Sequence, residues 1–551
     1  MPSLLDHVTA RLAAFHARRV YGRFARALAR VRQEQTWAMQ RALRLVSSSE
    51  FGRQHDLARV HAPDDLRRAV PLQTYDQLSP WLDRVWDGDT GALFAPGQAI
   101  LMFASSSGTT ARPKRIPVTP EFVKDYRRGW NTFGLKMLSD HPRAILRPIL
   151  QGSGRLDESH SPTGVPCGAI TGLLARTQKR IVRRYYVGRP EVAHLDEPRA
   201  RYYTLVRLGI VRDVAFAITA NPATLIQMAK TAAEEADALI RDVHDGTLSS
   251  TIVPEPSLRA TLSAGLRPSP ARAAELDRLR HAHGVLRPRE FWDLVFLACW
   301  TGGSMGHYLP RLRDWYGPLP VRDVGLLASE GRVSIPLADD SAAGVVDAQS
   351  ALFEFIPAEQ ALDADPDTLW AWEVEPGREY AVVLTNTAGL VRYRLDDVVR
   401  VHGWEGQAPV IEFLHRAGRI SSVAGEKITE HQVVEAVHQA CDKLGIQGLE
   451  FIVAPQWDDP PFYRLSVEGA APDDLAMEVD AALCAQNEEY ASRRKSRRLG
   501  VLQTRSLPGG AIVAMDRALI ARRRSTSEQY KRPCLFTQPG EDDQALSAIS
   551  Q

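Results

Sequence analysis

The chain has 551 residues, which is too long for one ordinary hydrophobic core and indicates two or more domains. Its composition, 44% hydrophobic and 24% charged, is typical of a soluble globular protein and excludes a disordered or membrane-embedded chain. The net charge of +2 gives no overall field that would favour nucleic acid or a membrane surface.

The first segment of the chain is predicted to be helical. Residues 1–20 lack the uninterrupted apolar core of a signal peptide. Apolar residues further on recur at spacings that favour one helix face, namely Phe24, Leu28, Val31, Met39, Leu43 and Val46. Because arginines fill much of the remainder, the helix could lie on a membrane, but a helix packed on its own domain is the favoured interpretation.

Strand and helix signals alternate after Pro71. Residues 99–107 read as a strand that runs into a small-residue loop, and residues 119–138 read as a helix with Thr119 as N-cap and Pro120 at its first position. Residues 212–219 and 221–240 repeat this strand-to-helix pattern. No run of about 18 apolar residues predicts a transmembrane helix.

The second half of the chain is predicted to contain a strand-rich region followed by a small α/β unit. Strand signals dominate residues 345–415, with apolar runs at 351–357, 380–386, 398–404 and 410–416. The last 130 or so residues are typical of a small α/β unit, with a helix over 428–444 and strands over 449–455 and 463–469.

The cysteines and histidines suggest no metal or disulfide framework. The five cysteines are scattered and form no Cys-x-x-Cys pair, so a reduced, cytoplasmic protein is expected. The fifteen histidines show no metal-ligand spacing, and the absence of Gly-x-Ser-x-Gly disfavours a serine hydrolase. Basic runs at 492–498 and 521–525 lack interleaved aromatics and are interpreted as solvated edges rather than nucleic-acid sites.

The stretch FASSSGTTARPKRIPVT, residues 103–119, is typical of a polyphosphate site. Small residues allow close backbone approach, successive amides form an anion-binding nest, and Lys114 adds a full positive charge. It is not a Walker loop, since Arg115 follows the lysine where serine or threonine is required. On its own, such a loop is weak evidence for a phosphate site, because many loops rich in serine, threonine and glycine are only flexible linkers.

Three further segments make the pattern specific. SSGTTARPK resembles the phosphate loop of the acyl-adenylate-forming ligases, LLASEG (326–331) resembles their second motif, and GLVRYRLDDVVRV (389–401) resembles the third. HRAGRISSVAGEKITEHQV (415–433) is similar to their hinge and the start of their C-terminal domain. Together with residues 70–89 and STSEQYKRP near the end, these segments resemble the auxin-responsive family of acyl acid amido synthetases, over residues 35–535.

The resemblance implies a fold and an activity. The fold would be α/β, with a large N-terminal α/β domain carrying β-barrel elements over residues 1–415 and a small, mobile C-terminal α/β domain over 416–551. The activity would be ATP-dependent activation of a carboxylic acid as an acyl-adenylate, followed by amide formation with an amino acid or other amine. ATP and Mg²⁺ would be required, and neither nucleic acid nor a membrane is an expected partner.

The resemblance also assigns roles to residues of the N-terminal domain. Lys114 would neutralise the β- and γ-phosphates, beside donors from Ser106, Ser107, Gly108, Thr109 and Thr110. Glu330 would hold Mg²⁺, and Ser329 would line the nucleotide or acyl pocket. Asp397 would accept hydrogen bonds from the ribose, with Tyr393 shaping the site. Gly302 and Gly303 would let the adenine lie against backbone, although a tight turn explains them nearly as well.

The C-terminal domain would supply two lysines. Lys427 would meet the α-phosphate in one half-reaction and Lys531 in the other, as the small domain rotates about a hinge near Gly418. Arg419 would touch the nucleotide.

Three positions depart from the family pattern. Ala111 stands where a glycine is usual in the phosphate loop, Leu326 where an aromatic residue often precedes the Ser-Glu pair, and Asp396 where a glycine usually precedes the ribose aspartate. Two alternatives therefore stay open: an acyl-adenylating ligase with a thiol acceptor, and a catalytically inactive relative that binds nucleotide or acid.

Overall fold

The computed structural model describes residues 4–106, 114–302, 305, 308–361, 363–417, 420–446, 449–523 and 534–547. The chain divides into two compact units, one with residues up to 106 and from 114 to 417, the other with the residues from 418 onward. Each unit has a hydrophobic core of its own. Among the described residues, no helix combines the length and the apolar character that a membrane crossing needs.

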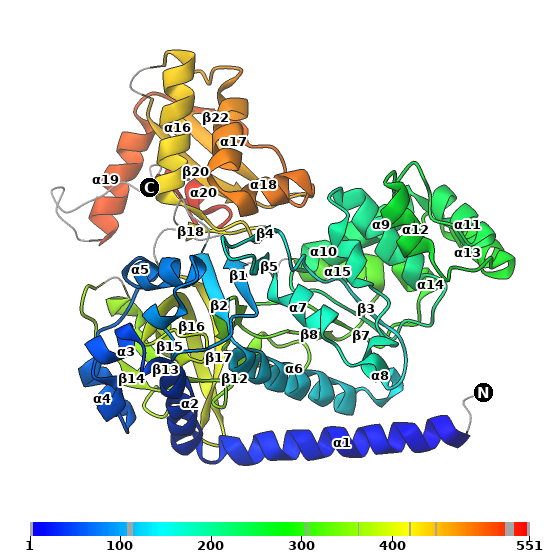
Figure 1. Cartoon of the computed structure of the whole chain (residues 1–551). Coiled ribbons are helices and arrows are strands. Elements are labelled where there is room, and N and C mark those ends of the chain that lie inside the picture. Colours follow the sequence, from blue (N-terminus) through cyan, green and yellow to red (C-terminus); the bar gives the residue numbers. More distant parts are fainter. Residues whose placement is uncertain are drawn as a thin grey trace. The chain divides into compact units, whose positions relative to one another are not determined.

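The N-terminal segment forms two helices rather than one continuous helix. Helix α1 (Leu4–Leu28) and helix α2 (Val31–Val46) are separated at Arg30, whose φ of −146° is not helical. All six apolar residues of the predicted face are buried. Helix α1 packs beside α6 (Pro120–Asp140), as Figure 1 shows, and α2 packs on the strands β13 (Ala351–Pro357) and β15 (Glu379–Asn386) of the same unit. The interpretation as helices packed on their own domain is therefore confirmed.

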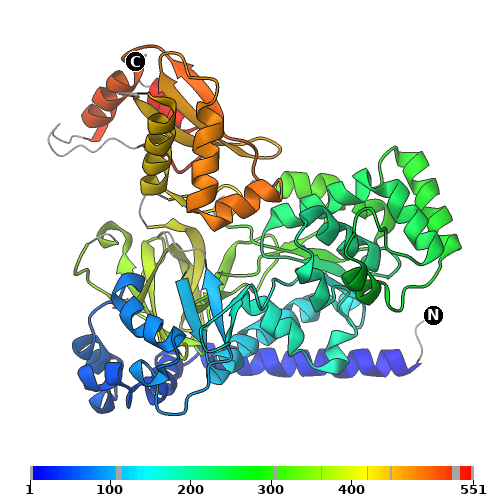
Figure 2. The ribbon, with the colours of Figure 1, turned by 45° about the horizontal axis from the view of Figure 1, so that its top comes forward.

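A parallel sheet forms one layer of the first unit. Its order is β3 (Ile149–Gln151), β6 (Phe216–Ile218), β7 (Phe296–Ala298) and β8 (Val321–Arg322), with every neighbouring pair parallel. Helices α9 (Pro198–Gly209), α10 (Pro222–Glu234) and α15 (Leu309–Tyr316) belong to the group of helices that both views place around this sheet (Figures 1 and 2). The predicted helix over 221–240 is divided, because α10 ends at Glu234 and α11 (Ala236–Asp245) begins anew.

A second four-stranded sheet, in which the strand directions are mixed, carries the two ends of the predicted phosphate loop. Strand β1 (Met102–Ser106) pairs antiparallel with β2 (Lys114–Val118) and parallel with β5 (Pro166–Gly168), which in turn pairs with β4 (Ser159–His160). Residues 107–113, between β1 and β2, lie outside the described residues. Helix α6 then starts as predicted: Thr119 accepts a hydrogen bond from the backbone N–H of Phe122, and Pro120 occupies the first position.

The predicted strand-rich region 345–415 is an antiparallel sheet. Its order is β11 (Ser334–Ile335), β12 (Ala343–Val346), β17 (Ala408–Arg416), β16 (Tyr393–Glu405), β15 (Glu379–Asn386), β13 (Ala351–Pro357) and β14 (Leu369–Trp370). A separate short hairpin joins β9 (Leu327–Ala328) to β10 (Gly331–Arg332).

The remaining α-helices of the first unit have between 4 and 14 residues. They are α3 (Glu50–Gln54), α4 (Pro63–Ala69), α5 (Tyr75–Trp86), α7 (Ile170–Arg176), α8 (Arg180–Arg183), α12 (Pro256–Ser263), α13 (Pro270–His283) and α14 (Pro288–Phe291).

The second unit is a small α/β structure, as predicted. Strands β20 (Phe451–Gln456), β21 (Phe462–Glu468) and β22 (Gln503–Leu507) form a sheet, and β18 (Ile420–Ser421) pairs with β19 (Ile428–Thr429). Its helices are α16 (Glu430–Leu444), α17 (Leu475–Gln486), α18 (Glu488–Lys495), α19 (Ala511–Arg523) and α20 (Glu541–Ser547). Val437, Leu465 and Val479 from helices and sheet are fully buried together in its core.

Candidate active site

Three residues from distant parts of the first unit meet in a buried polar cluster. Lys114 begins β2, Glu330 lies in the turn between β9 and β10, and Tyr393 begins β16. The Lys114 Nζ donates to the Tyr393 hydroxyl at 2.8 Å, and that hydroxyl donates to Glu330 Oε1 at 3.2 Å. The ammonium lies 3.6 Å from the same carboxylate oxygen. None of the three is more than 6% exposed.

The surroundings of this cluster are aromatic. The Lys114 Nζ lies 5.5 Å from the ring centroids of both Tyr75 and Tyr393, a distance at which a cation is attracted to a ring face. Burial raises the pKa of Tyr75, whose hydroxyl accepts a hydrogen bond from the Arg115 backbone N–H at 3.0 Å. In a site shielded from water, a fixed cation and a fixed carboxylate interact strongly with ligand charges. The cluster therefore suits a polyphosphate and a hard divalent cation.

The turn that carries Glu330 is held on two sides. The Ser329 Oγ donates to the Ser105 carbonyl on β1 at 3.2 Å, and the Asn386 Nδ2 on β15 donates to the Glu330 carbonyl at 2.6 Å. Three of the four predicted motifs, at 103–119, 326–331 and 389–401, are thereby brought together. Asn386 was missed by sequence reasoning because its role depends on the pairing of β15 with the rest of its sheet.

Two adjacent aspartates on β16 differ in environment. Asp397 is buried, whereas the Asp396 side chain is 41% exposed. Asp396 has φ of +61°, the left-handed conformation that glycine adopts most readily. The Asp396 carbonyl accepts a hydrogen bond from the Ala417 N–H at 2.7 Å.

A buried aspartate that sequence reasoning missed fixes the turn containing Gly302. Asp323 Oδ2 accepts hydrogen bonds from the backbone N–H and the hydroxyl of Thr301 at 2.6 and 2.9 Å, and Oδ1 accepts from the Gly325 N–H at 2.6 Å. Burial raises the pKa of Asp323 to about 6 although these hydrogen bonds act to lower it. An aspartate directly after a buried strand was the available signal.

Gly302 is packed closely against protein. A Cβ added there would lie 3.2 Å from the Phe413 carbonyl on β17. Close approach to a neighbouring strand therefore accounts for this glycine without a nucleotide, and its contact with adenine stays a prediction.

In the second unit, Lys427 stands on a fixed turn. The fully buried Glu426 carboxylate accepts hydrogen bonds from the N–H groups of Val423 and Ala424, each at 2.7 Å, and from the Tyr463 hydroxyl. Burial raises the pKa of Glu426. The Asn487 Nδ2 donates to the Lys427 carbonyl at 3.1 Å, and Lys427 itself has φ of +49°.

The structure does not describe several of the predicted site residues. Ser106 ends β1, but its side chain is not described. Other predicted residues lie outside the described residues, namely Ser107, Gly108, Thr109, Thr110, Ala111, Gly303, Gly418, Arg419 and Lys531. Their predicted roles stay predictions.

Known proteins resemble this chain over nearly its whole length. Jasmonoyl–L-amino acid synthetase JAR4 of Nicotiana attenuata is 27% identical over 505 residues, covering 87% of this chain and 86% of that relative. Indole-3-acetic acid-amido synthetase GH3.2 of Arabidopsis thaliana is 25% identical over 484 residues, covering 80% and 86%. The solved structure of GH3.15 acyl acid amido synthetase matches with a TM-score of 0.64 at 20% identity, covering 95% of this chain and 94% of that one, which confirms the predicted fold.

Family models account for most of the sequence. The GH3 family N-terminal domain matches residues 20–321, the central domain residues 344–416 and the C-terminal domain residues 431–540. The predicted resemblance to the acyl acid amido synthetases is confirmed, and the chain belongs to the GH3 family.

Proposed function

We propose that this protein activates a carboxylic acid with ATP as an acyl-adenylate and then transfers the acyl group to the amine of an amino acid or another amine. A carboxylate resists attack because it is negatively charged and its oxygen is a poor leaving group. Transfer of AMP to the carboxylate releases pyrophosphate and creates a mixed anhydride, from which the amine displaces AMP. The observation that carries the proposal is the buried cluster of Lys114, Tyr393 and Glu330, where three predicted motifs converge.

The role of Lys114 follows from its place. It is the first described residue after the predicted phosphate loop. Its ammonium is held in place by a hydrogen bond to the Tyr393 hydroxyl. A positioned cation stabilises charge that develops on phosphate oxygens during transfer, and needs no reorganisation to do so. Tyr393 fixes the distance between this cation and Glu330.

Glu330 fits a magnesium ion that is shared with ATP. Within the described residues, no group of three or more His, Cys, Asp or Glu side chains could hold a metal ion. Magnesium is commonly held by one or two carboxylates together with substrate phosphates, which is the arrangement that a single buried carboxylate beside a phosphate site provides. When bound, the ion would neutralise charge on the departing pyrophosphate. Glu330 would be its protein ligand.

The two-part organisation fits two half-reactions. We propose that residues 1–415 form the adenylate-forming domain and residues 416–551 a mobile domain that brings Lys427 in one half-reaction and Lys531 in the other. Asp397, Gly302, Gly303, Ser329 and Arg419 would contact nucleotide or acid, with loop donors from Ser106 to Thr110. A cytoplasmic location is proposed, where ATP and free amino acids are available.

The substrate class can be tested directly. The purified full-length protein is offered a panel of carboxylic acids that includes jasmonic and indole-3-acetic acids, the acids in the names of its relatives. Acid-dependent pyrophosphate release from ATP is measured first. Active acids are then supplied with a mixture of amino acids and coenzyme A, and the products are identified by mass spectrometry. We expect an amide, with one AMP released per amide formed, and no thioester.

A matched pair of lysine variants controls the assay. Lys114→Ala should lose pyrophosphate release, whereas Lys124→Ala, which removes an exposed lysine of α6, should retain it. Acyl-CoA without amide would favour the thiol ligase. Absence of acid-dependent pyrophosphate release with every acid would favour the inactive relative.

A further inference from the structure

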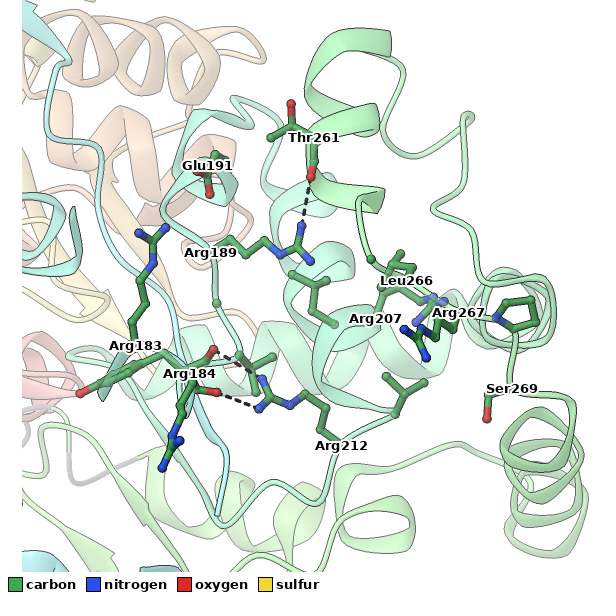
Figure 3. Close-up of a pocket in the computed structure, with 17 residues that line it drawn as sticks. Arg183, Arg184, Arg189, Glu191, Arg207, Arg212, Thr261, Leu266, Arg267 and Ser269 are labelled. Carbon is green, nitrogen blue, oxygen red and sulfur yellow. Dashed lines mark hydrogen bonds between the residues drawn. The ribbon is translucent and has the colours of Figure 1, made fainter. Parts of the chain in front are cut away.

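A second polar site lies among the helices of the first unit. A hollow of about 750 Å³ is bordered by α8, the end of α9 and the segment between α12 and α13 (Figure 3). None of its lining residues belongs to the proposed active site. Arginines dominate the lining, and we call this site the arginine hollow; they are Arg183, Arg184, Arg189, Arg207, Arg212 and Arg267.

The arginine hollow has an excess of positive charge. Glu191 is its only lining acidic side chain in the described chain. Within the described residues, none of the six guanidinium groups has a carboxylate oxygen within 4.0 Å. Nearby arginines behave differently: Arg147 and Arg272 each pair with a carboxylate at 2.6 Å. The hollow therefore gathers guanidinium groups that lack the counter-charges available elsewhere in the same unit.

Neutral carbonyl groups hold several of these arginines in place. Arg189 donates to the Thr261 carbonyl at 3.0 Å, and Arg212 donates to the Arg184 carbonyl at 3.0 Å (Figure 3). Arg189 also donates to the Ala264 carbonyl at 2.7 Å. Carbonyl partners fix a guanidinium without cancelling its charge, so less conformational entropy is lost when an anion binds.

Arg207 is the most deeply placed of the six. It is fully buried and donates to the carbonyls of Thr247 and Asp242 at 3.1 and 2.7 Å. The Asp242 carboxylate, whose charge acts to raise the pKa of Arg207, accepts hydrogen bonds from the Tyr203 hydroxyl and from the Ser249 N–H, the latter at 2.6 Å. Burial lowers the pKa of Arg207 and of Arg212, which means that their charged forms are poorly solvated. A bound anion would stabilise the charged forms of these two arginines.

The rest of the lining suits an organic ligand. Val187, Leu208, Val211, Leu266 and Pro268 supply apolar surface between the arginines. The volume falls within the range of roughly 300–1,000 Å³ typical of small-molecule sites. Guanidinium groups bind phosphate oxygens through paired hydrogen bonds, and several together match a ligand with several negative charges.

We propose that the arginine hollow binds a small organic polyphosphate of nucleotide size, at a site separate from the adenylation residues. A nucleotide and another phosphorylated metabolite share the chemistry that the hollow recognises.

Calorimetric titration of the full-length protein with inorganic tripolyphosphate and with GTP tests the proposal, and hydrogen exchange locates the binding. Both probes should slow exchange in residues 183–189 and 261–269, whatever they do at the active site. Arg183→Ala combined with Arg267→Ala removes two exposed side chains that form no hydrogen bond within the described residues. This double variant should weaken binding at the hollow by about tenfold or more, because charge-assisted hydrogen bonds are lost.

A matched double variant controls for net charge. Arg241→Ala combined with Arg278→Ala removes the same charge from exposed positions outside the hollow and should bind both probes as the wild type does. Acid-dependent pyrophosphate release should be unchanged in both double variants. The proposal would be overturned if the two double variants bound the probes with equal affinity. It would also be overturned if neither probe slowed hydrogen exchange in residues 183–189 and 261–269. Binding of an RNA oligonucleotide that depends on Arg183 and Arg267, without binding of tripolyphosphate, would also overturn it and identify a nucleic-acid surface.

Discussion

The buried ion pair of Lys114 and Glu330 determines what a substitution at either residue does. Each charge lies in a water-shielded site and is compensated by the other at 3.6 Å. Removing one partner of a buried pair leaves the other uncompensated, so stability and catalysis both respond. A variant that keeps the shape of the side chain separates these effects better than alanine does.

We expect Glu330→Gln to lower adenylation by about 10²-fold or more, because a preorganised electrostatic contact and a magnesium ligand are lost together. Pyrophosphate exchange measures the first half-reaction, and urea unfolding measures the free energy of unfolding. Glu375→Gln, at an exposed position of the same unit, is the control and should change neither quantity appreciably. Full activity of Glu330→Gln, or full activity of the wild type in EDTA, would contradict the assignment.

At this scale, the sequence identified the charged residues but not their partners. Lys114, Glu330 and Tyr393 were predicted from motifs, yet their mutual hydrogen bonds depend on how β2, the β9–β10 turn and β16 pack. Asn386 and Asp323 were not predicted, because a polar residue beside an apolar run is common in sequences. Only the structure shows that both side chains are buried and hydrogen-bonded to fixed partners. The conformation of Asp396, with φ of +61°, was likewise invisible in the residue type.

At the scale of elements, Asp323 joins the carboxyl ends of two neighbouring parallel strands. The residue directly follows β8, and its Thr301 partner lies shortly after β7. Such strand ends are where ligands bind in open α/β sheets. Anchoring the Thr301–Gly302 turn to Asp323 keeps this edge ordered.

The raised pKa of Asp323 predicts a pH dependence of stability. The pKa is about 6 in the folded protein against a reference value of 3.8, so between these values the folded state binds more protons than the unfolded state. The free energy of unfolding should therefore fall as pH rises through this window, by about 1.4 kcal/mol per pH unit from this group. Relative to Asp323→Asn, the wild type should lose roughly 1–2 kcal/mol between pH 5 and pH 7, as measured by urea unfolding.

Asp365→Asn removes an exposed carboxylate of the same unit and serves as the control. Its stability should track the wild type across the same pH range. A constant difference between wild type and Asp323→Asn from pH 5 to pH 7 would show that this carboxyl does not titrate there.

The order of helices and strands was largely predictable, but their pairing was not. Long apolar runs such as residues 351–357 and 380–386 indicated β13 and β15 directly. Strands of two residues, such as β9 and β10, are too short to show a periodicity. The break between α1 and α2 was missed because apolar spacing continues across Arg30 while only the backbone changes. The position of β17 between β12 and β16 requires long-range contacts that no local pattern encodes.

At the scale of the whole molecule, the second unit has its own core and carries Lys427 on a turn fixed by Glu426 and Asn487. A lysine on such a rigid turn moves as the unit moves. If the proposed rotation exchanges Lys427 for Lys531 at the α-phosphate, each lysine serves one half-reaction, and its loss leaves the other step intact.

We therefore expect Lys427→Ala and Lys531→Ala to impair different steps. Pyrophosphate exchange reports adenylation, and amide formation from preformed acyl-adenylate reports transfer. Each variant should lose about tenfold or more in one assay and much less in the other, because a charge contact is removed from only one transition state. Lys443→Ala, at an exposed position of α16, removes the same charge and should affect neither step. Equal losses in both assays for both variants would mean that the two lysines act together in a single arrangement, and the domain would then have no need to rotate.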